Sequence, residues 1–230
     1  GVVVTWHEVR SGNSYGYAAA YDSATGAVTM PPTELAGFQR IRLVALSTKI
    51  LLSFYDGLTG FYVYALDPAS PATALAGAST TIIASNGVYY DVVKVPGQDL
   101  AFYACTRSGG GSYQMVTFTS ALVTTTASKS AACVAIAVSA APNGTHVQIV
   151  RRSSSTSIHG DYIAISGLST VNDNTAIATT TTDPTYIACA HRSVTNGGQY
   201  RCYVYWNEGA GPSIGALSSG GGITSPWSGS

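Results

Sequence analysis

The stretch LAFYACTRSGGGSYQMVTF, residues 100–118, holds the unit from which the fold can be predicted. It runs from an apolar segment, 100–105, through a turn with three glycines at 109–111 into a second segment rich in Tyr, Val and Phe. β-Branched and aromatic residues favour strands, and glycine supplies the backbone freedom that a tight turn requires. The stretch therefore predicts an antiparallel hairpin.

The same pattern occurs five times along the chain. Each copy joins an apolar strand to an aromatic or β-branched return strand across a Gly-bearing turn. The other copies are residues 2–21, 50–66, 133–150 and 186–206. The glycines that mark the turns, Gly12, Gly57, Gly110, Gly144 and Gly197, are separated by 45, 53, 34 and 53 residues, about 46 on average. The short third spacing indicates that the fourth copy has lost a strand or that its boundary lies elsewhere.

This period predicts an all-β fold, a β-propeller or partial propeller of about five four-stranded blades, because one such blade needs roughly 40 to 50 residues. Segments between the hairpins, such as 40–46 and 89–95, supply the additional strands. Neighbouring blades bury each other's faces, which explains why the unit repeats. A β-sandwich or jelly roll is the alternative, but neither predicts a repeat at a fixed period.

The units are expected to form a single propeller-like domain over residues 1–217. Residues 218–230 are rich in Gly and Ser and are expected to be a flexible tail. The chain opens at Gly1 directly on a strand-like run, which favours a segment of a longer protein, and no signal peptide is recognisable in it. Its apolar runs are well short of the roughly 18 residues that a membrane helix needs.

Charge excludes several classes of partner. Charged residues make up 10% of the chain and the net charge is zero, whereas ordinary domains are about 25% charged. Without a basic excess, the attraction to nucleic-acid phosphates or to an anionic membrane is missing. We therefore expect no nucleic-acid partner and no membrane partner.

The cysteine spacing excludes a typical zinc site. Cys105, Cys133, Cys189 and Cys202 are too sparse for a disulfide scaffold and form no C-x-x-C pair. Cys189 and Cys202 flank one turn, and we interpret them as buried thiols, with a disulfide as the alternative.

Arginine and tyrosine recur at the marked turns. The candidate binding residues on this loop rim are Arg10, Tyr15, Arg107, Tyr113, Arg192 and Tyr200. The three arginines are expected to lie on one rim, either as an anion-binding ring or, the interpretation we favour, as cations that keep sheet edges from pairing. Exposed tyrosines on such a rim suit sugar or protein binding.

No catalytic constellation is complete in the sequence. The glutamates Glu8, Glu34 and Glu208 stand in no sialidase-type Asp box, and no nucleophile elbow, phosphate loop or dinucleotide motif occurs. His7 and His191 end equivalent strands and are expected to be exposed, with a two-histidine metal or acid–base site as the alternative. The polar run 151–161 is expected to be a solvated loop. We expect a protein that is not an enzyme, without catalytic residues, cofactor or metal.

Low charge, abundant Thr, Ser, Ala and Gly, and strand-turn-strand units such as 100–118 and 186–206 resemble the β-propeller modules of bacteriophage tail-machine proteins, such as nozzle and tail-tip components. The resemblance implies a structural role in a virion or another extracellular setting, with copies of itself or neighbouring tail proteins as partners. The alternative is a secreted propeller that binds cell-surface glycan through aromatic residues at its rim. A sialidase- or lyase-type enzyme is the third and least favoured class.

Overall fold

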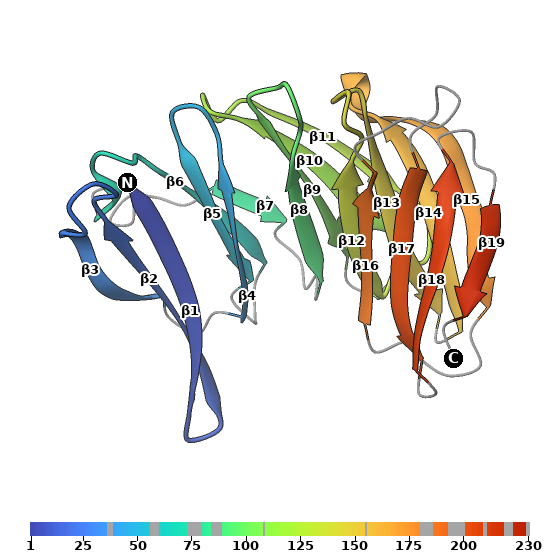
Figure 1. The fold of residues 1–230 in the computed structure, drawn as a ribbon, viewed down its shortest axis with the longest axis horizontal. Coiled ribbons are helices and arrows are strands. Elements are labelled where there is room, and N and C mark those ends of the chain that lie inside the picture. The colour runs from blue at the N-terminus through green and yellow to red at the C-terminus, as the bar shows by residue number, and fades with distance from the viewer. Residues whose placement is uncertain are drawn as a thin grey trace. The chain divides into compact units, whose positions relative to one another are not determined.

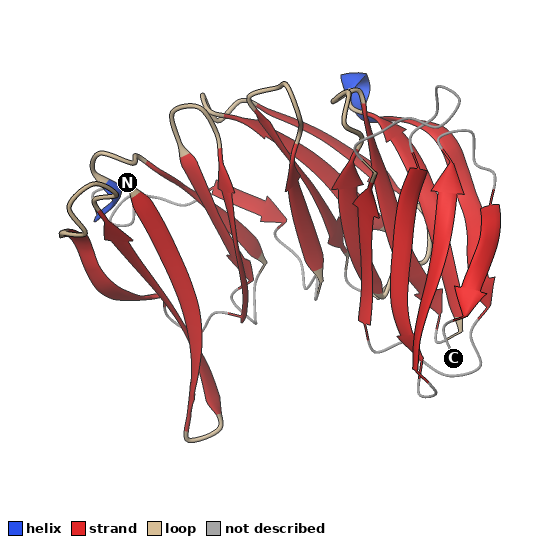
Figure 2. Ribbon diagram, viewed as in Figure 1, coloured by secondary structure: helices blue, strands red, loops and turns tan. Residues whose placement is uncertain are grey.

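The computed structural model describes residues 1–35, 39–55, 60–72, 80–83, 89–107, 109–154, 156–179, 186–192, 201–208, 211–218 and 223–228. Strands make up nearly all of the regular structure (Figure 2). Where the sequence predicted one domain, the chain divides into two compact units. They are Gly1–Val88 with Thr119–Val123, and Tyr89–Phe118 with Thr124–Ser230.

The first unit contains two antiparallel sheets (Figure 1). Sheet one consists of β1 (Val2–Arg10), β2 (Asn13–Tyr21) and β3 (Val28–Leu35). Sheet two consists of β4 (Gln39–Ala45), β5 (Ile50–Tyr55), β6 (Phe61–Leu66) and β7 (Thr80–Ile83).

The second unit contains three antiparallel sheets. Sheet three consists of β8 (Tyr90–Lys94), β9 (Leu100–Thr106), β10 (Tyr113–Thr119) and β11 (Thr124–Lys129). Sheet four consists of β12 (Ala135–Ala140), β13 (His146–Ser154), β14 (Ser157–Ala164) and β15 (Ser169–Thr179), with the short 3-10 helix η1 (Ser166–Leu168) before β15. Sheet five consists of β16 (Tyr186–His191), β17 (Arg201–Glu208), β18 (Gly211–Ser218) and β19 (Ile223–Ser228).

The propeller prediction is confirmed by the order of the strands. In every sheet, strands that are neighbours in the chain are also hydrogen-bonded neighbours. This is the meander of a propeller blade and not the Greek-key order of a sandwich. Sheets two to five have the predicted four strands, and sheet one has three among the residues that the structure describes.

The short spacing of 34 residues comes from a change in the turn that carries the marker glycine. Gly110 lies between β9 and β10, the second and third strands of sheet three, whereas Gly144 lies between β12 and β13, the first and second strands of sheet four. Sheet four therefore has all four strands, and the boundary of the fourth copy was misplaced.

The expected Gly/Ser-rich tail contains a strand. In β19, Ile223 lies opposite Leu217 and Trp227 lies opposite Ile214, both on β18. Apolar and β-branched residues within the segment support strand pairing despite the surrounding glycines. Strand β19 thus lies within the segment 218–230 that was expected to be a Gly/Ser-rich tail.

Sheets within each unit pack face to face. In the first unit, Ala18 and Met30 of sheet one share a buried cluster with Leu52 and Leu66 of sheet two. The side of sheet one that carries Ala18 is therefore buried against sheet two. In the second unit, β12 lies between β8 and β16, so the first strands of sheets three, four and five follow one another in chain order.

In the second unit, both sides of sheet four are buried. Val147 and Ile149 pack with Phe102 of sheet three, and Val150 on the other side packs with Trp206 of sheet five. The fit against sheet five is tight at Gly160, because a Cβ atom there would lie 2.7 Å from Leu217 Cδ1.

Strands β8 and β12 run in the same direction. Early in β8, Asp91 Oδ2 accepts a hydrogen bond from Val138 N at 2.9 Å. Beyond the end of β8, Gln98 Nε2 donates to Gly144 O at 2.5 Å. A residue later in the first segment thus contacts a residue later in the second. The turn that follows β8 therefore lies at the end of β12.

Candidate functional site

An aromatic and charged cluster lies on the side of sheet one that faces away from sheet two. Alternate residues of a strand share a face, and the register places Trp6 opposite Tyr17, Glu8 opposite Tyr15, and Tyr17 opposite Glu34. We call this cluster the sheet-one patch: Trp6, Glu8, Arg10, Tyr15, Tyr17 and Glu34. Two of its members, Arg10 and Tyr15, are among the residues predicted from the sequence.

The aromatic rings of the patch are held in stacked geometry. The ring centroids of Trp6 and Tyr17 lie 5.3 Å apart with an interplanar angle of 16°. The Arg10 guanidinium carbon lies 5.9 Å from the ring centroid of Tyr15 and 5.4 Å from that of Tyr17. These are cation–π distances, which fix the arginine over the rings.

Polar groups of the patch hydrogen-bond to one another. Arg10 Nη2 donates to Glu8 Oε2 at 2.6 Å, and Trp6 Nε1 donates to Glu8 Oε1 at 3.2 Å. The hydrogen bond from Arg10 is the main reason that the pKa of Glu8 lies below its usual range. Tyr17 donates its hydroxyl to Glu34 Oε2 at 3.0 Å, and burial together with this carboxylate raises the pKa of Tyr17. The tyrosine therefore stays protonated and acts as a donor.

The other predicted residues are not brought together into one site. Arg107 and Arg192 are exposed just after β9 and β16. Tyr113 is buried at the start of β10, so its ring is not presented at the surface. Tyr200 lies outside the described residues.

Arg107 and Arg192 lie at opposite ends of β12. The turn after Arg107 meets the beginning of β12, where Cys133 N donates to Gly110 O at 2.7 Å. Arg192 follows His191, whose backbone N donates to Ser139 Oγ near the end of β12. The expectation of one shared rim was wrong for this pair, because Arg107 follows a second strand and Arg192 follows a first strand.

The two histidines differ in their environment. His7 is exposed, as expected, and lies on the opposite side of β1 from Glu8. His191 is half-buried, and its Nδ1 lies 3.0 Å from Ser139 Oγ. Burial lowers the pKa of His191 to about 4. The expectation of an exposed histidine at position 191 was therefore wrong.

Sequence reasoning missed a buried charge cluster in the second unit. Asp161 on β14 is fully buried and accepts hydrogen bonds from Tyr113 Oη at 2.8 Å, Arg151 Nε at 2.8 Å and Lys129 Nζ at 2.9 Å. Lys129 also pairs with the exposed carboxylate of Asp173. The run 151–161, expected to be a solvated loop, thus belongs largely to the paired strands β13 and β14.

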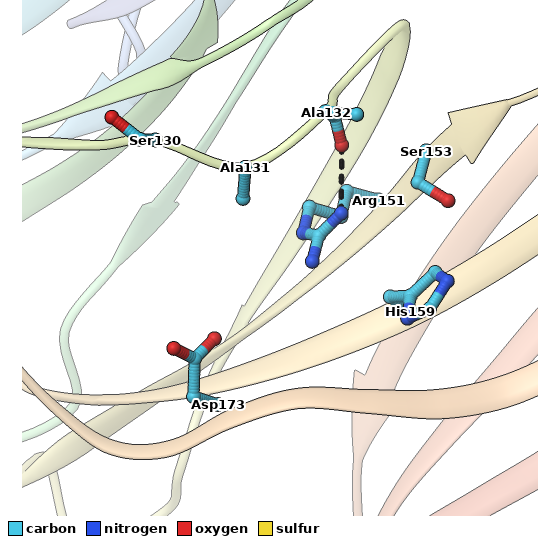
Figure 3. A pocket seen from close by; sticks show the side chains of 7 residues that line it. All are labelled: Ser130, Ala131, Ala132, Arg151, Ser153, His159 and Asp173. Carbon is cyan, nitrogen blue, oxygen red and sulfur yellow. Dashed lines mark hydrogen bonds between the residues drawn. The ribbon is translucent and has the colours of Figure 1, made fainter.

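A pocket of about 350 Å³ lies beside this cluster (Figure 3). Its lining residues are Ser130, Ala131, Ala132, Arg151, Ser153, His159 and Asp173. Arg151 Nη1 donates to Ala132 O at 2.7 Å, the dashed line in Figure 3. Because Arg151 and Asp173 are both engaged in pairs with neighbouring groups, the charges at this pocket hold two sheets together.

The four cysteines are free thiols. Cys105, Cys133 and Cys202 are buried and Cys189 is half-buried. Burial raises the pKa of Cys133 to about 12, and a hydrogen bond with Cys202 raises the pKa of Cys189. Such thiols are poor nucleophiles, because the thiolate is the reactive form.

No group of three His, Cys, Asp or Glu side chains among the described residues is placed to hold a metal ion. No helix among them has the length and apolar character that crossing a membrane requires.

Comparison with solved structures identifies the fold. The chain is similar to TolB from Acinetobacter baumannii, with a TM-score of 0.54, 13% identity, and coverage of 96% of this chain and 50% of TolB. It is also similar to puromycin hydrolase, with a TM-score of 0.51, 14% identity, and coverage of 98% of this chain and 38% of the hydrolase. TolB is a β-propeller protein. The chain spans 50% of the length of TolB and 38% of the length of the hydrolase. At such identities the likeness shows the fold alone. No protein-family model and no curated protein matches the chain.

Proposed function

We propose that this propeller chain is a non-enzymatic interaction module whose partner is a protein, of the kind that assembles a phage tail or virion surface. The sheet-one patch is the observation that carries the proposal. Protein interfaces are enriched in Tyr, Trp and Arg at their centres, and Trp6, Tyr15 and Arg10 lie together on one face. Exposed Val2 and Val4 extend this face along β1.

The polar groups of the sheet-one patch already hydrogen-bond to one another, which favours a protein partner over a sugar. Sugar sites combine an aromatic platform with polar groups that are placed to receive the ligand's hydroxyls. In the patch, Glu8 accepts from Arg10 and Trp6, and Glu34 accepts from Tyr17. A protein surface can cover such a face without breaking these bonds.

Glycan binding is the second candidate function, and the stacked pair of Trp6 and Tyr17 is the observation that favours it. A glycan array separates the two candidates. We expect no saturable sugar binding by the wild-type chain. Saturable binding that is lost in Trp6→Ala, and kept in a Val9→Ala control on the other side of β1, would replace the protein partner by a glycan.

The protein partner is tested by cross-linking in assembled particles. A photo-cross-linking amino acid at position 15, within the patch, should link the chain to one defined structural protein of a purified virion or comparable assembly. The same amino acid at position 171, on exposed β15, is the control and should give no such product. Absence of a specific product from position 15 contradicts the proposal.

Enzymatic activity has a separate test. Turnover of sialoside or polyuronide substrates would revive the enzyme class if it disappeared in Glu8→Gln. We expect no turnover, because Glu8 is already held by Arg10 and Trp6.

A further inference from the structure

Exposed apolar side chains concentrate on two sheet faces. Seven of the ten large hydrophobic side chains that are exposed in the described structure lie on sheets one and five, and six of these seven share one face of their sheet. The six are Val2, Val4 and Val28 on sheet one, and Tyr186, Tyr203 and Tyr205 on sheet five. Apolar groups gathered on one face mark an interaction surface more strongly than scattered ones do.

The sheet-one face extends from the sheet-one patch to these valines. Val2 and Val4 share a side of β1 with Trp6, and Val28 lies opposite Tyr21 on the same side. Val4 is 42% exposed and Val28 is 58% exposed. The reverse side of sheet one packs on sheet two.

The sheet-five face consists of tyrosines that alternate with small residues. Tyr203 and Tyr205 on β17 lie opposite Ala190 and Ala188 on β16. Tyr186 meets Tyr205 edge to face, with ring centroids 6.0 Å apart. The reverse side of sheet five packs on sheet four through residues such as Trp206.

We propose that the sheet-five face of one copy of this chain packs on the sheet-one face of a second copy. The inference rests on the proposed function and names its partner. Contacts between neighbouring sheets within the units are of this kind, with one face of a sheet covered by the next sheet in chain order. The sheet-five face also combines a half-buried alanine, Ala188, with large side chains around it, which favours interdigitation.

Charge favours this pairing over a contact between identical faces. The sheet-one face carries Glu8, Arg10 and Glu34, a net charge of −1, and the sheet-five face carries Arg201 on the same side of β17 as Tyr203. Opposite charges steer association and like charges oppose it. Contact between two sheet-one faces would set the excess carboxylates against each other.

A contact between two different faces leaves one face of each kind open at the ends of an assembly. Such head-to-tail association continues into rings or linear arrays, whereas contact between identical faces stops at a dimer. The distinction provides a direct test of which faces meet.

The test is sedimentation velocity with light scattering on the full chain, from micromolar to submillimolar concentration. We expect the mean mass of the wild type to rise with concentration. Val4→Glu on the sheet-one face and Tyr203→Glu on the sheet-five face should each weaken association at least tenfold. An equimolar mixture of the two variants should form a dimer and nothing larger, since each variant keeps one intact face.

Matched controls place the same charge elsewhere. Val9→Glu, on the opposite side of β1, and Val171→Glu, on β15, change valines that are 65% and 55% exposed. Both should associate like the wild type. Circular dichroism checks that each variant folds. If Val4→Glu unfolds, Val28→Gln replaces it on the sheet-one face, and if Tyr203→Glu unfolds, Tyr186→Gln replaces it on the sheet-five face. Both replacements lie at more exposed positions.

Three results would overturn the inference: a wild type that stays monomeric, controls that dissociate like the face variants, or a mixture that does not dimerise. A monomeric wild type that still cross-links from position 15 to a different structural protein would overturn this inference alone. Failure of both experiments would overturn the proposed function as well.

Discussion

Tyr113 donates its hydroxyl to Asp161 at 2.8 Å, and the bond joins sheet three to sheet four with both side chains fully buried. Asp161 also accepts from Arg151 on its own sheet and from Lys129 on sheet three. A buried carboxylate is tolerated when charged and hydrogen-bonding partners surround it. Asp161 is therefore the common acceptor for donors from two sheets.

Replacing Asp161 by Asn should destabilise the second unit by about 3–5 kcal/mol, because Arg151 and Lys129 would lose the charge that compensates them. Urea unfolding, followed by the fluorescence of the buried Trp206, measures the change. The control is Asp173→Asn, since Asp173 also pairs with Lys129 but its side chain is 60% exposed, and it should cost no more than about 1 kcal/mol. Equal losses in the two variants would contradict a special role for Asp161.

Replacing Tyr113 by Phe removes only the hydroxyl of the bond to Asp161. We expect a loss of about 1–3 kcal/mol, because the ring stays in place while a buried acceptor loses a donor. The same substitution in the Asp161→Asn background should cost clearly less. Additive losses in this double-mutant cycle would show that the two residues do not interact.

His191 should make the second unit less stable in acid. Its pKa is about 4 in the fold, below its usual value of 6.5, so the unfolded chain binds a proton more tightly than the folded chain. Stability is therefore kept above pH 6.5 and lost as the pH falls toward 4, by at most about 3 kcal/mol. His191→Gln should flatten the dependence of the unfolding free energy on pH across this window.

Gly144 should tolerate no side chain. Its φ is +69°, and the backbone oxygen of Pro96 occupies the place of a Cβ atom. Gly144→Ala should cost more than the about 1 kcal/mol that left-handed backbone alone imposes on alanine. Gly12→Ala is the matched control, with φ of +80° and nothing within 4 Å of the added Cβ. Equal melting temperatures for the two variants would exclude crowding at position 144.

The sequence predicted the architecture because strand-turn-strand units repeat regardless of the residues that fill them. It could not predict which turn of each blade carries the marker glycine, because every antiparallel turn makes similar demands on the backbone. Gly110 and Gly144 each stand between two strand-like segments but lie in different turns of their sheets. This single shift misplaced a blade boundary and placed Arg107 and Arg192 on one rim.

The candidate site was predicted only in part. Arg10 and Tyr15 could be found because they flank a short turn, whereas Tyr113 follows a similar turn and points into the core. A tyrosine fits either side of a strand, so its type does not reveal its direction. Arg151 was a usable signal for the missed cluster. It stands in the same alternation as the apolar residues Val147 and Ile149, so it was expected on their buried side of the strand. A buried arginine needs a carboxylate partner.

The bond network around Asp161 has a consequence for how the chain is made. Tyr113 and Lys129 leave the ribosome before Asp161, and until the later residue arrives, sheet three holds a cation and a hydroxyl that only water can satisfy. Sheet three therefore cannot reach its final packing while it is the newest part of the nascent chain. Translation that stops between residues 129 and 161 would leave the Tyr113 hydroxyl exposed, whereas the finished protein buries it against Asp161.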